Sequence, residues 1–138
     1  MRSIKKILTF LVVLIVLAAA GSYLIPSKYK VERSLVVQAK AEAIYPHVNK
    51  LKRWEEWTPW TTALDPTMKR TFSGPEEGAG AKMAWDGEKT GKGSLAITAS
   101  DAAKGIAYDL EFDEGKYKSS GVIAFEPSGG GTQVLWTN

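Results

Sequence analysis

The side chains that could move a proton or hold a metal are few and scattered. His47 is the only histidine, and there is no cysteine. Thiolate catalysis, disulfides and Cys-ligated metals are therefore excluded, and a single histidine predicts no metal site. The adjacent pairs Glu55–Glu56 and Glu76–Glu77 point apart as chain neighbours, so we interpret them as solvated charge rather than as an acid–base pair. No catalytic residue and no cofactor are predicted.

Glycine-rich segments invite a phosphate-binding interpretation, which the spacing rejects. The run GEKTGKG (Gly87 to Gly93) has no two glycines at the P-loop spacing, and its Gly91-Lys92 pair is followed by Gly93 instead of Ser or Thr. No G-x-S-x-G nucleophile elbow occurs either. The run is interpreted as a flexible hairpin loop.

Aromatic residues remain, and they gather unusually in KRWEEWTPWTT (Lys52 to Thr62). Three of the chain's five tryptophans lie there. With few polar groups among them, the aromatics have the composition of an apolar pocket with one or two polar handles, or of a core. We predict eight pocket-lining residues: Trp57, Trp60, Met83, Trp85, Tyr108, Leu110, Phe112 and Trp136.

The elements that must position these residues follow from periodicity. A strand is expected over Tyr29 to Val37, then a helix over Ala39 to Asn49 and a short helix over Leu51 to Trp57. About six strands follow, beginning at Lys69 to Ser73 and Ala81 to Asp86. Three of them are expected around Leu95, Ile97 and Ala99, over Ile106 to Phe112 and over Gly121 to Glu126, and the last over Thr132 to Thr137. The order predicts an α+β domain with a curved antiparallel sheet.

Alternation also predicts which side chains share a face. Met83, Trp85, Tyr108, Leu110 and Trp136 should lie on the concave face. Lys82, Asp109 and Glu111 should lie on the convex face, and Asp86 should also point away from the apolar side.

The N-terminal region is different in character. Ile7 to Ile25 is a 19-residue uncharged segment, roughly 28 Å long as a helix, which matches a bilayer core. Arg2, Lys5 and Lys6 precede it, which favours a single-pass anchor with a cytoplasmic N-terminus and the domain outside, in the periplasm or the extracellular space. The alternative is a signal peptide cleaved after Ala18-Ala19-Ala20 and a secreted domain. The expected division is an anchor or signal over residues 1–26 and a domain over 27–138.

The charge balance says little about partners. Three of the 18 basic residues precede the apolar segment, and the other 15 balance the 15 acidic residues. No basic stripe with interleaved aromatics remains, which argues against nucleic acid as a partner.

Several motifs, taken in this order, resemble the SRPBCC superfamily (START-like, helix-grip domains), specifically its polyketide cyclase/dehydratase-like members. They are Val31 to Trp60, Phe72 to Trp85, Gly91 to Ile97, Tyr108 to Phe112 and Gly129 to Trp136. The resemblance implies a sheet of about seven strands, with two short helices after the first strand, and a hydrophobic cavity. It implies a long C-terminal helix too, and the chain ends at Asn138 without one. We therefore expect a C-terminally incomplete domain with an open, aromatic-lined groove on the concave face.

The expected function is a membrane-anchored domain that binds a hydrophobic small molecule or lipid between sheet and helices. The alternatives are a cyclase- or dehydratase-type enzyme and an accessory interaction domain with a vestigial pocket.

Overall fold

The computed structural model describes residues 2–24 and 30–138, with side chains described from residue 11 onward in the first of these ranges. The chain forms two compact units, Met1–Lys30 and Val31–Asn138, and each is described by itself. The first unit contains one helix, α1 (Arg2–Ser22). No helix in the described part of the chain combines the length and the apolar character that a membrane crossing needs. The expected anchor includes Ile25 and the side chains of residues 7–10, which lie outside the described residues.

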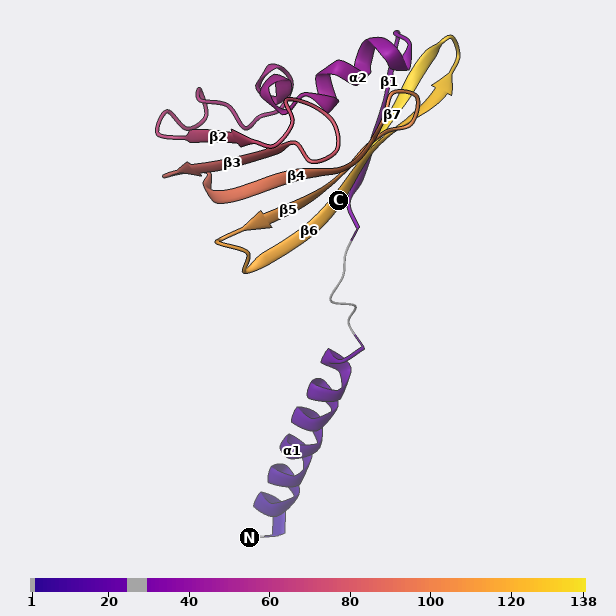
Figure 1. Ribbon diagram of the computed structural model, residues 1–138. Helices are drawn as coiled ribbons and strands as arrows, with labels where there is room; N and C mark the ends of the chain where they lie inside the picture. Colours follow the sequence, from indigo (N-terminus) through magenta and orange to yellow (C-terminus); the bar gives the residue numbers. More distant parts are fainter. Residues whose placement is uncertain (1, 25–29) are drawn as a thin grey trace. The chain divides into compact units, whose positions relative to one another are not determined.

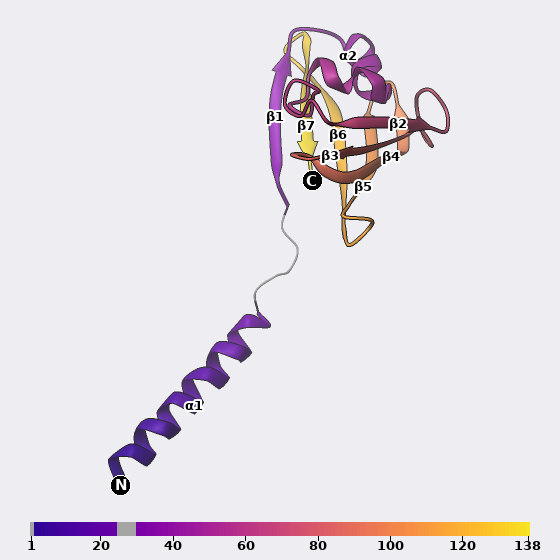
Figure 2. The same cartoon turned by 90° about the vertical axis from the view of Figure 1, so that its left-hand side faces the viewer.

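The second unit is a seven-stranded antiparallel sheet with two short helical elements. Its strands lie in the order β1-β7-β6-β5-β4-β3-β2, so the first two strands in the sequence form the two edges. After β1 come α2 and the 3-10 helix η1, which pack over one face of the curved sheet (Figures 1 and 2). The bounds are β1 (Glu32–Val37), α2 (Ala41–Asn49), η1 (Leu51–Glu56), β2 (Lys69–Ser73), β3 (Lys82–Gly87), β4 (Gly91–Asp101), β5 (Gly105–Phe112), β6 (Tyr117–Ser128) and β7 (Gly131–Thr137).

The predicted α+β architecture and the order of its elements are confirmed, with local differences. The segment expected as a second α-helix is a tighter 3-10 helix, and it ends one residue before Trp57. The strand expected over Gly121 to Glu126 extends in both directions, because β6 continues its pairing with β5 and β7. Pro46 lies inside α2, as the sequence required.

The concave face carries the core, as alternation predicted. Met83, Tyr108 and Leu110 are buried on it, and Trp85 and Trp136 are half-buried. On the opposite face Lys82, Asp109 and Asp86 are exposed, and Glu111 is half-buried.

The expected alternation fails at one position in β4. The register shifts between Ile97, which lies opposite Tyr108, and Ala99, which lies opposite Ala107. This bulge moves Ala99 off the face of Leu95 and Ile97, because an extra residue reverses the alternation that follows it. Ser100 lies opposite Ile106 as a result, and there its hydroxyl bonds to Asn49 Oδ1 and to the Tyr45 hydroxyl of α2.

Two glycines on the concave face make room for aromatic rings. Gly93 lies opposite Trp85, and Gly121 lies opposite Tyr108. A Cβ at Gly93 would overlap the Trp85 ring, and one at Gly121 would overlap the Tyr108 ring and the Asn138 amide. The absence of a side chain at each glycine therefore lets the facing ring pack over the neighbouring strand, β4 for Trp85 and β6 for Tyr108.

The open concave groove that the sequence predicted is present only in part. Trp54 of η1 lies over the middle of the face, where it is 3% exposed. Toward the sheet margins the apolar side chains are less covered: Leu35 is 68% and Tyr117 58% exposed.

Candidate functional site

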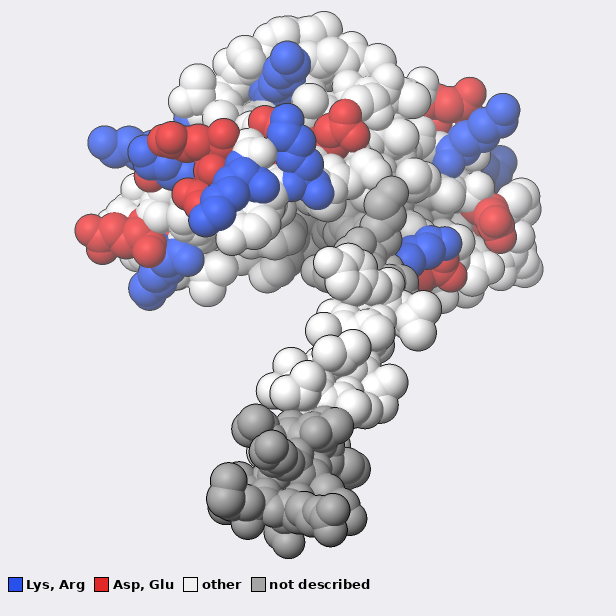
Figure 3. Space-filling view, turned by 90° about the horizontal axis from the view of Figure 1, so that it is seen from below, with Lys and Arg blue, Asp and Glu red and all other residues white. Residues whose placement is uncertain are grey.

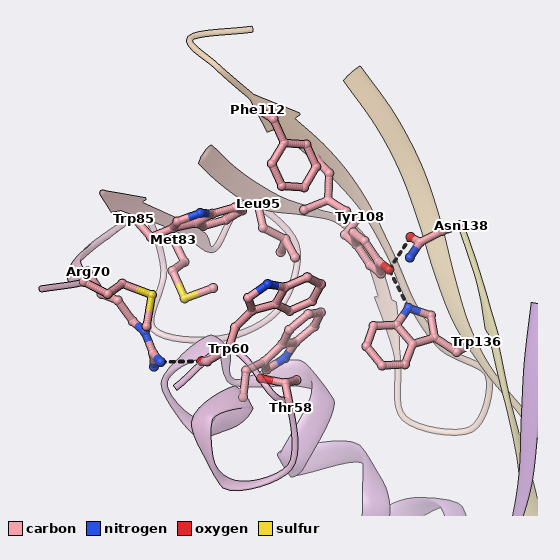
Figure 4. Close-up of a pocket in the computed structure, with 13 residues that line it drawn as sticks. Thr58, Trp60, Arg70, Met83, Trp85, Leu95, Tyr108, Phe112, Trp136 and Asn138 are labelled. Carbon is pink, nitrogen blue, oxygen red and sulfur yellow. Dashed lines mark hydrogen bonds between the residues drawn. The ribbon is translucent and has the colours of Figure 1, made fainter. Parts of the chain in front are cut away.

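A cavity lies between the concave face and the segment that leaves η1. It is lined by Trp54, Thr58, Trp60, Met68, Arg70, Met83, Trp85, Leu95, Tyr108, Leu110, Phe112, Trp136 and Asn138 (Figure 4). Most of the lining is aromatic or aliphatic, and its polar side chains are Thr58, Arg70, Asn138 and the hydroxyl of Tyr108. Such a lining suits an apolar molecule held by a few polar contacts.

The cavity is small in this structure. Its volume is about 30 Å³, which is room for about two water molecules. Ligand sites for small molecules usually measure about 300–1,000 Å³. A ligand of even ten non-hydrogen atoms must therefore displace part of the lining.

Aromatic rings form the wall nearest the helices. Trp54 lies edge-on to Tyr108, with 5.7 Å between ring centroids, and 6.3 Å from Trp136. Its indole nitrogen donates to the carbonyl of Val48 at 2.9 Å, which satisfies the only polar atom of the buried side chain. A second ring pair, Trp85 and Phe112, is 5.7 Å apart on β3 and β5.

One hydrogen-bonded cluster marks the wall formed by β5 and β7. The Trp136 indole N–H donates to the Tyr108 hydroxyl at 2.6 Å, and that hydroxyl donates to Asn138 Oδ1 at 2.6 Å. Burial raises the pKa of Tyr108 above its ordinary value, while its bonds to Trp136 and Asn138 pull the pKa down. The neutral phenol is the favoured form in this apolar wall.

A second polar feature lies at the opposite end of the cavity, as Figure 4 shows. One Arg70 nitrogen donates to the Trp60 carbonyl at 2.6 Å, and another donates to Glu55 at 3.1 Å. Glu55 also accepts from the backbone N–H and the hydroxyl of Thr62, at 3.1 and 2.9 Å. Arg70 and Glu55 thus connect β2 to the segment that carries Trp60.

Seven of the eight residues predicted from the sequence line this cavity together, and the exception is Trp57. Trp57 packs against Trp54 and Trp136, at 5.1 and 5.5 Å, and donates from its indole to the carbonyl of His47 at 2.9 Å. Its position three residues after Trp54 does place the two rings in contact. Trp57 is bonded to α2 and is not among the residues that line this cavity.

Other candidate residues lie apart from the cavity. His47 is on α2, where its side chain is 43% exposed and Nδ1 lies 3.2 Å from Glu56. Glu76 and Glu77 lie 3.1 and 3.9 Å from the Lys50 ammonium, both largely exposed. No group of three or more His, Cys, Asp or Glu that could hold a metal occurs among the described residues. On the surface seen in Figure 3, basic and acidic side chains are interspersed, with no single-sign patch in view.

Sequence reasoning missed five lining residues besides Trp54. Arg70 shares a face of β2 with Phe72, in a strand that was predicted correctly, and it lies opposite Trp85 on the concave face. The two-residue spacing from the apolar Phe72 was the signal that could have found it. Leu95 was on the predicted apolar side of its strand. Thr58, Met68 and Asn138 carry no comparable signal, because loops or chain ends position them.

Comparisons with known proteins define the fold. No family model matches the sequence, and no curated protein matches it either. Solved structures do match: the Aha1 dimer from Colwellia psychrerythraea has a TM-score of 0.59 at 16% identity, covering 80% of this chain and 75% of that one. Ara h 8.0201 has a TM-score of 0.55 at 18% identity, with 79% and 75% covered. CalU16 from Micromonospora echinospora has 0.54 at 12% identity, with 78% and 58% covered.

These identities are low enough that the likeness shows the fold alone. The match extends over most of the second unit, in which the seven antiparallel strands follow the order described above. The domain Val31–Asn138 shares the fold of these structures, with a curved seven-stranded antiparallel sheet of the helix-grip type.

Proposed function

We propose that the domain Val31–Asn138 binds a hydrophobic small molecule or lipid in the concave-face cavity. The observation that carries the proposal is the continuous apolar lining, to which four tryptophans contribute. A cavity of about 30 Å³ cannot hold such a ligand as it stands, so binding must move a lining group outward. Trp60 is the large lining group that we expect to move, because it is 42% exposed and follows η1 in an irregular segment.

Binding fits the cavity better than proton-transfer chemistry does. The ionisable side chains of the lining are Arg70 and Tyr108. Arg70 is paired with Glu55, and burial holds Tyr108 as a neutral phenol. Burial raises the pKa of Tyr108, which moves it away from the neutral range where a general acid or base works best, and Arg70 is committed to its ion pair.

The test is saturable binding of naphthalene by the full chain in lipid nanodiscs, with uptake by empty nanodiscs subtracted. Met83→Trp should fill the cavity and weaken binding at least about tenfold, since the larger ring occupies the ligand's space. The matched control is Ala84→Trp, which adds the same ring on the exposed face of β3. Equal binding by both variants would refute the assignment of the cavity.

The second candidate is an interaction domain with a vestigial pocket, and the small cavity volume favours it. The same experiment separates the two functions. If the unmodified chain shows no saturable uptake of naphthalene, the vestigial pocket is the better description.

We also propose that the segment Ile7 to Ile25 tethers the domain to a membrane and places it outside the cytoplasm. The support comes from the sequence: an uncharged stretch of bilayer length follows Arg2, Lys5 and Lys6. Cell fractionation with N-terminal sequencing of the mature protein tests this. A soluble exported form that begins near Gly21 would show a cleaved signal peptide instead.

A further inference from the structure

The hydrogen-bonded cluster of Tyr108, Trp136 and Asn138 holds unused hydrogen-bonding capacity. The single indole N–H of Trp136 is committed to the Tyr108 oxygen, and the phenolic hydrogen is committed to Asn138 Oδ1. The Tyr108 oxygen therefore keeps one lone pair. The Asn138 amide nitrogen keeps both of its hydrogens, since it donates no bond to the protein among the described residues.

This unused capacity is one acceptor next to one donor group. The Tyr108 oxygen, which is the free acceptor, lies 2.6 Å from Asn138 Oδ1. The free donor is the nitrogen of the same Asn138 amide, so donor and acceptor are close together. Both residues line the cavity, and Asn138 is exposed at its margin (Figure 4). A ligand group that both donates and accepts can satisfy the pair, and a hydroxyl does this with one atom.

The backbone around the cluster is shaped to keep it in place. Gly121 lies directly opposite Tyr108, and any side chain there would strike the Tyr108 hydroxyl and the Asn138 amide oxygen. Asn138 is fixed further by paired backbone bonds with Val31, at 2.8 and 2.9 Å. The orientation of the cluster is thus set by the sheet before any ligand arrives.

Charge argues against an ionised ligand. The surroundings that raise the pKa of Tyr108 disfavour a buried negative charge at this wall. At the other end of the cavity, Arg70 is already neutralised by Glu55 at 3.1 Å. Neither end offers an unpaired cation to a carboxylate, so a charged headgroup would lose its hydration without a partner.

We infer that the ligand is a neutral, mainly apolar molecule with a hydroxyl group, and that Tyr108 and Asn138 bind this hydroxyl. The inference rests on the proposed function and names the ligand class for the same cavity. The ligand hydroxyl donates to the Tyr108 oxygen and accepts from the Asn138 amide nitrogen. The apolar body lies among Trp60, Trp85 and Phe112.

The experiment compares three probes of one size: naphthalene, 2-naphthol and 2-naphthoate. Each is titrated against the full chain in nanodiscs, with uptake by empty nanodiscs subtracted. We expect 2-naphthol to bind roughly fivefold to tenfold more tightly than naphthalene, which is the effect of about one net hydrogen bond. The ionised 2-naphthoate should bind most weakly.

Variants locate the preference. Tyr108→Phe keeps the ring and should remove the advantage of 2-naphthol over naphthalene, while Tyr117→Phe, at a 58% exposed tyrosine of β6, should leave it unchanged. If Tyr108→Phe does not fold, Asn138→Ala removes the exposed donor and should reduce the same ratio.

The outcomes separate the two proposals. Equal binding of 2-naphthol and naphthalene by the unmodified chain would overturn the ligand class and leave the binding function standing. A preference that survives both Tyr108→Phe and Asn138→Ala would overturn the assignment to this cluster. Absence of saturable binding for all three probes would defeat the proposed function itself.

Discussion

The two ends of the concave face are built from the same strands and yet differ in how they are covered. At the closed end, Ile106, Ile123 and Phe125 are 1–6% exposed beneath α2. At the cavity end, Trp85, Phe112 and Trp136 are half-buried and Trp60 is 42% exposed. Strand β5 runs through both ends: Ile106 and Tyr108 are 3% and 1% exposed, Leu110 is 7% exposed, and Phe112 is half-buried.

This difference separates two properties of a strand residue: the face on which its side chain lies, and how far other elements cover that side chain. Alternation decides which face a side chain occupies, and β5 alternates without interruption from Ile106 to Phe112. Coverage is decided by α2, η1 and the segment after η1, which come from elsewhere in the sequence. The closed end is therefore a core, and the cavity end is an opening covered by the segment after η1, residues 57–68, which is called the cover below.

The largest expected effect is a loss of stability when a side chain of the closed end is truncated. Ile106→Ala should lower the free energy of unfolding by about 2–5 kcal/mol, because the site is already packed and cannot collapse fully. Phe112→Ala removes more atoms but should cost only roughly half as much, since solvent already reaches that ring. Chemical denaturation of both variants checks the order, and a larger loss for Phe112→Ala would show that the cavity end is core as well.

The next expected effect concerns Asp65, which bonds the cover to the β3–β4 turn. Asp65 is 1% exposed, and its two oxygens accept bonds from the Thr67 and Thr90 hydroxyls and from the backbone N–H groups of Thr67, Lys89 and Thr90. The Thr67 hydroxyl first, and then the Thr90 and Lys89 amides, hold the pKa of Asp65 far below its ordinary value of 3.8.

Because this pKa is lowered in the folded state, the unfolded chain takes up the proton first as the pH falls. The stability that Asp65 contributes is therefore complete above about pH 5 and is lost as the pH falls below about 4. Asp65→Asn should lower the thermal midpoint on the order of 5–10 °C at neutral pH and flatten the acid decline. Asp86→Asn, at an exposed carboxylate of β3, is the control. An unchanged acid slope in Asp65→Asn would contradict the prediction.

The sequence was sufficient to predict which side chains lie on each face of the sheet, but not how the helices and the cover pack on it. Met83, Tyr108 and Leu110 could be placed because a strand alternates whatever packs on it. Ala99 could not, since a bulge depends on what the neighbouring strands and α2 require at that point. The place of Trp57 has a related cause: spacing pairs it with Trp54, whereas its indole bond to His47 depends on how α2 packs.

The cavity itself was predictable only as a composition. Its small volume depends on how the segment that carries Trp60 lies against the sheet, and residues distant in sequence determine this. The polar positions depend on register: Arg70 lies opposite Trp85, and Gly121 lies opposite Tyr108. Cross-strand register is not written in the residues of either strand alone.

The third prediction concerns the rate at which a ligand enters the cavity. Trp60→Ala should raise the association rate of naphthalene severalfold, because the side chain that closes the cavity is removed, and should change stability by only about 1 kcal/mol. Trp57→Ala is the matched control: that ring is 36% exposed on the same segment but does not line the cavity. Stopped-flow fluorescence measures both rates, and equal acceleration in the two variants would mean that the whole segment, rather than Trp60, closes the opening.

The smallest expected effect tests what holds the cover shut. Arg70 bonds to the Trp60 carbonyl and to Glu55, and Glu55 binds Thr62, so a single ion pair joins the cover to β2 at both sides of Trp60. The Arg70 side chain is 11% exposed and Glu55 is 41% exposed, so solvent screens the pair only partly. Glu55→Gln should therefore shift the opening equilibrium by a factor of about 2 to 5 and raise the rate of naphthalene entry accordingly. It should also reduce the dependence of that rate on salt, which weakens the pair in the unmodified chain. Glu56→Gln is the matched control, because Glu56 pairs with Arg53 at 2.9 Å on the same 3-10 helix without touching Trp60 or Thr62. If the two glutamine variants accelerate entry equally, the effect belongs to the charge of the segment and the Arg70–Glu55 pair is not the latch.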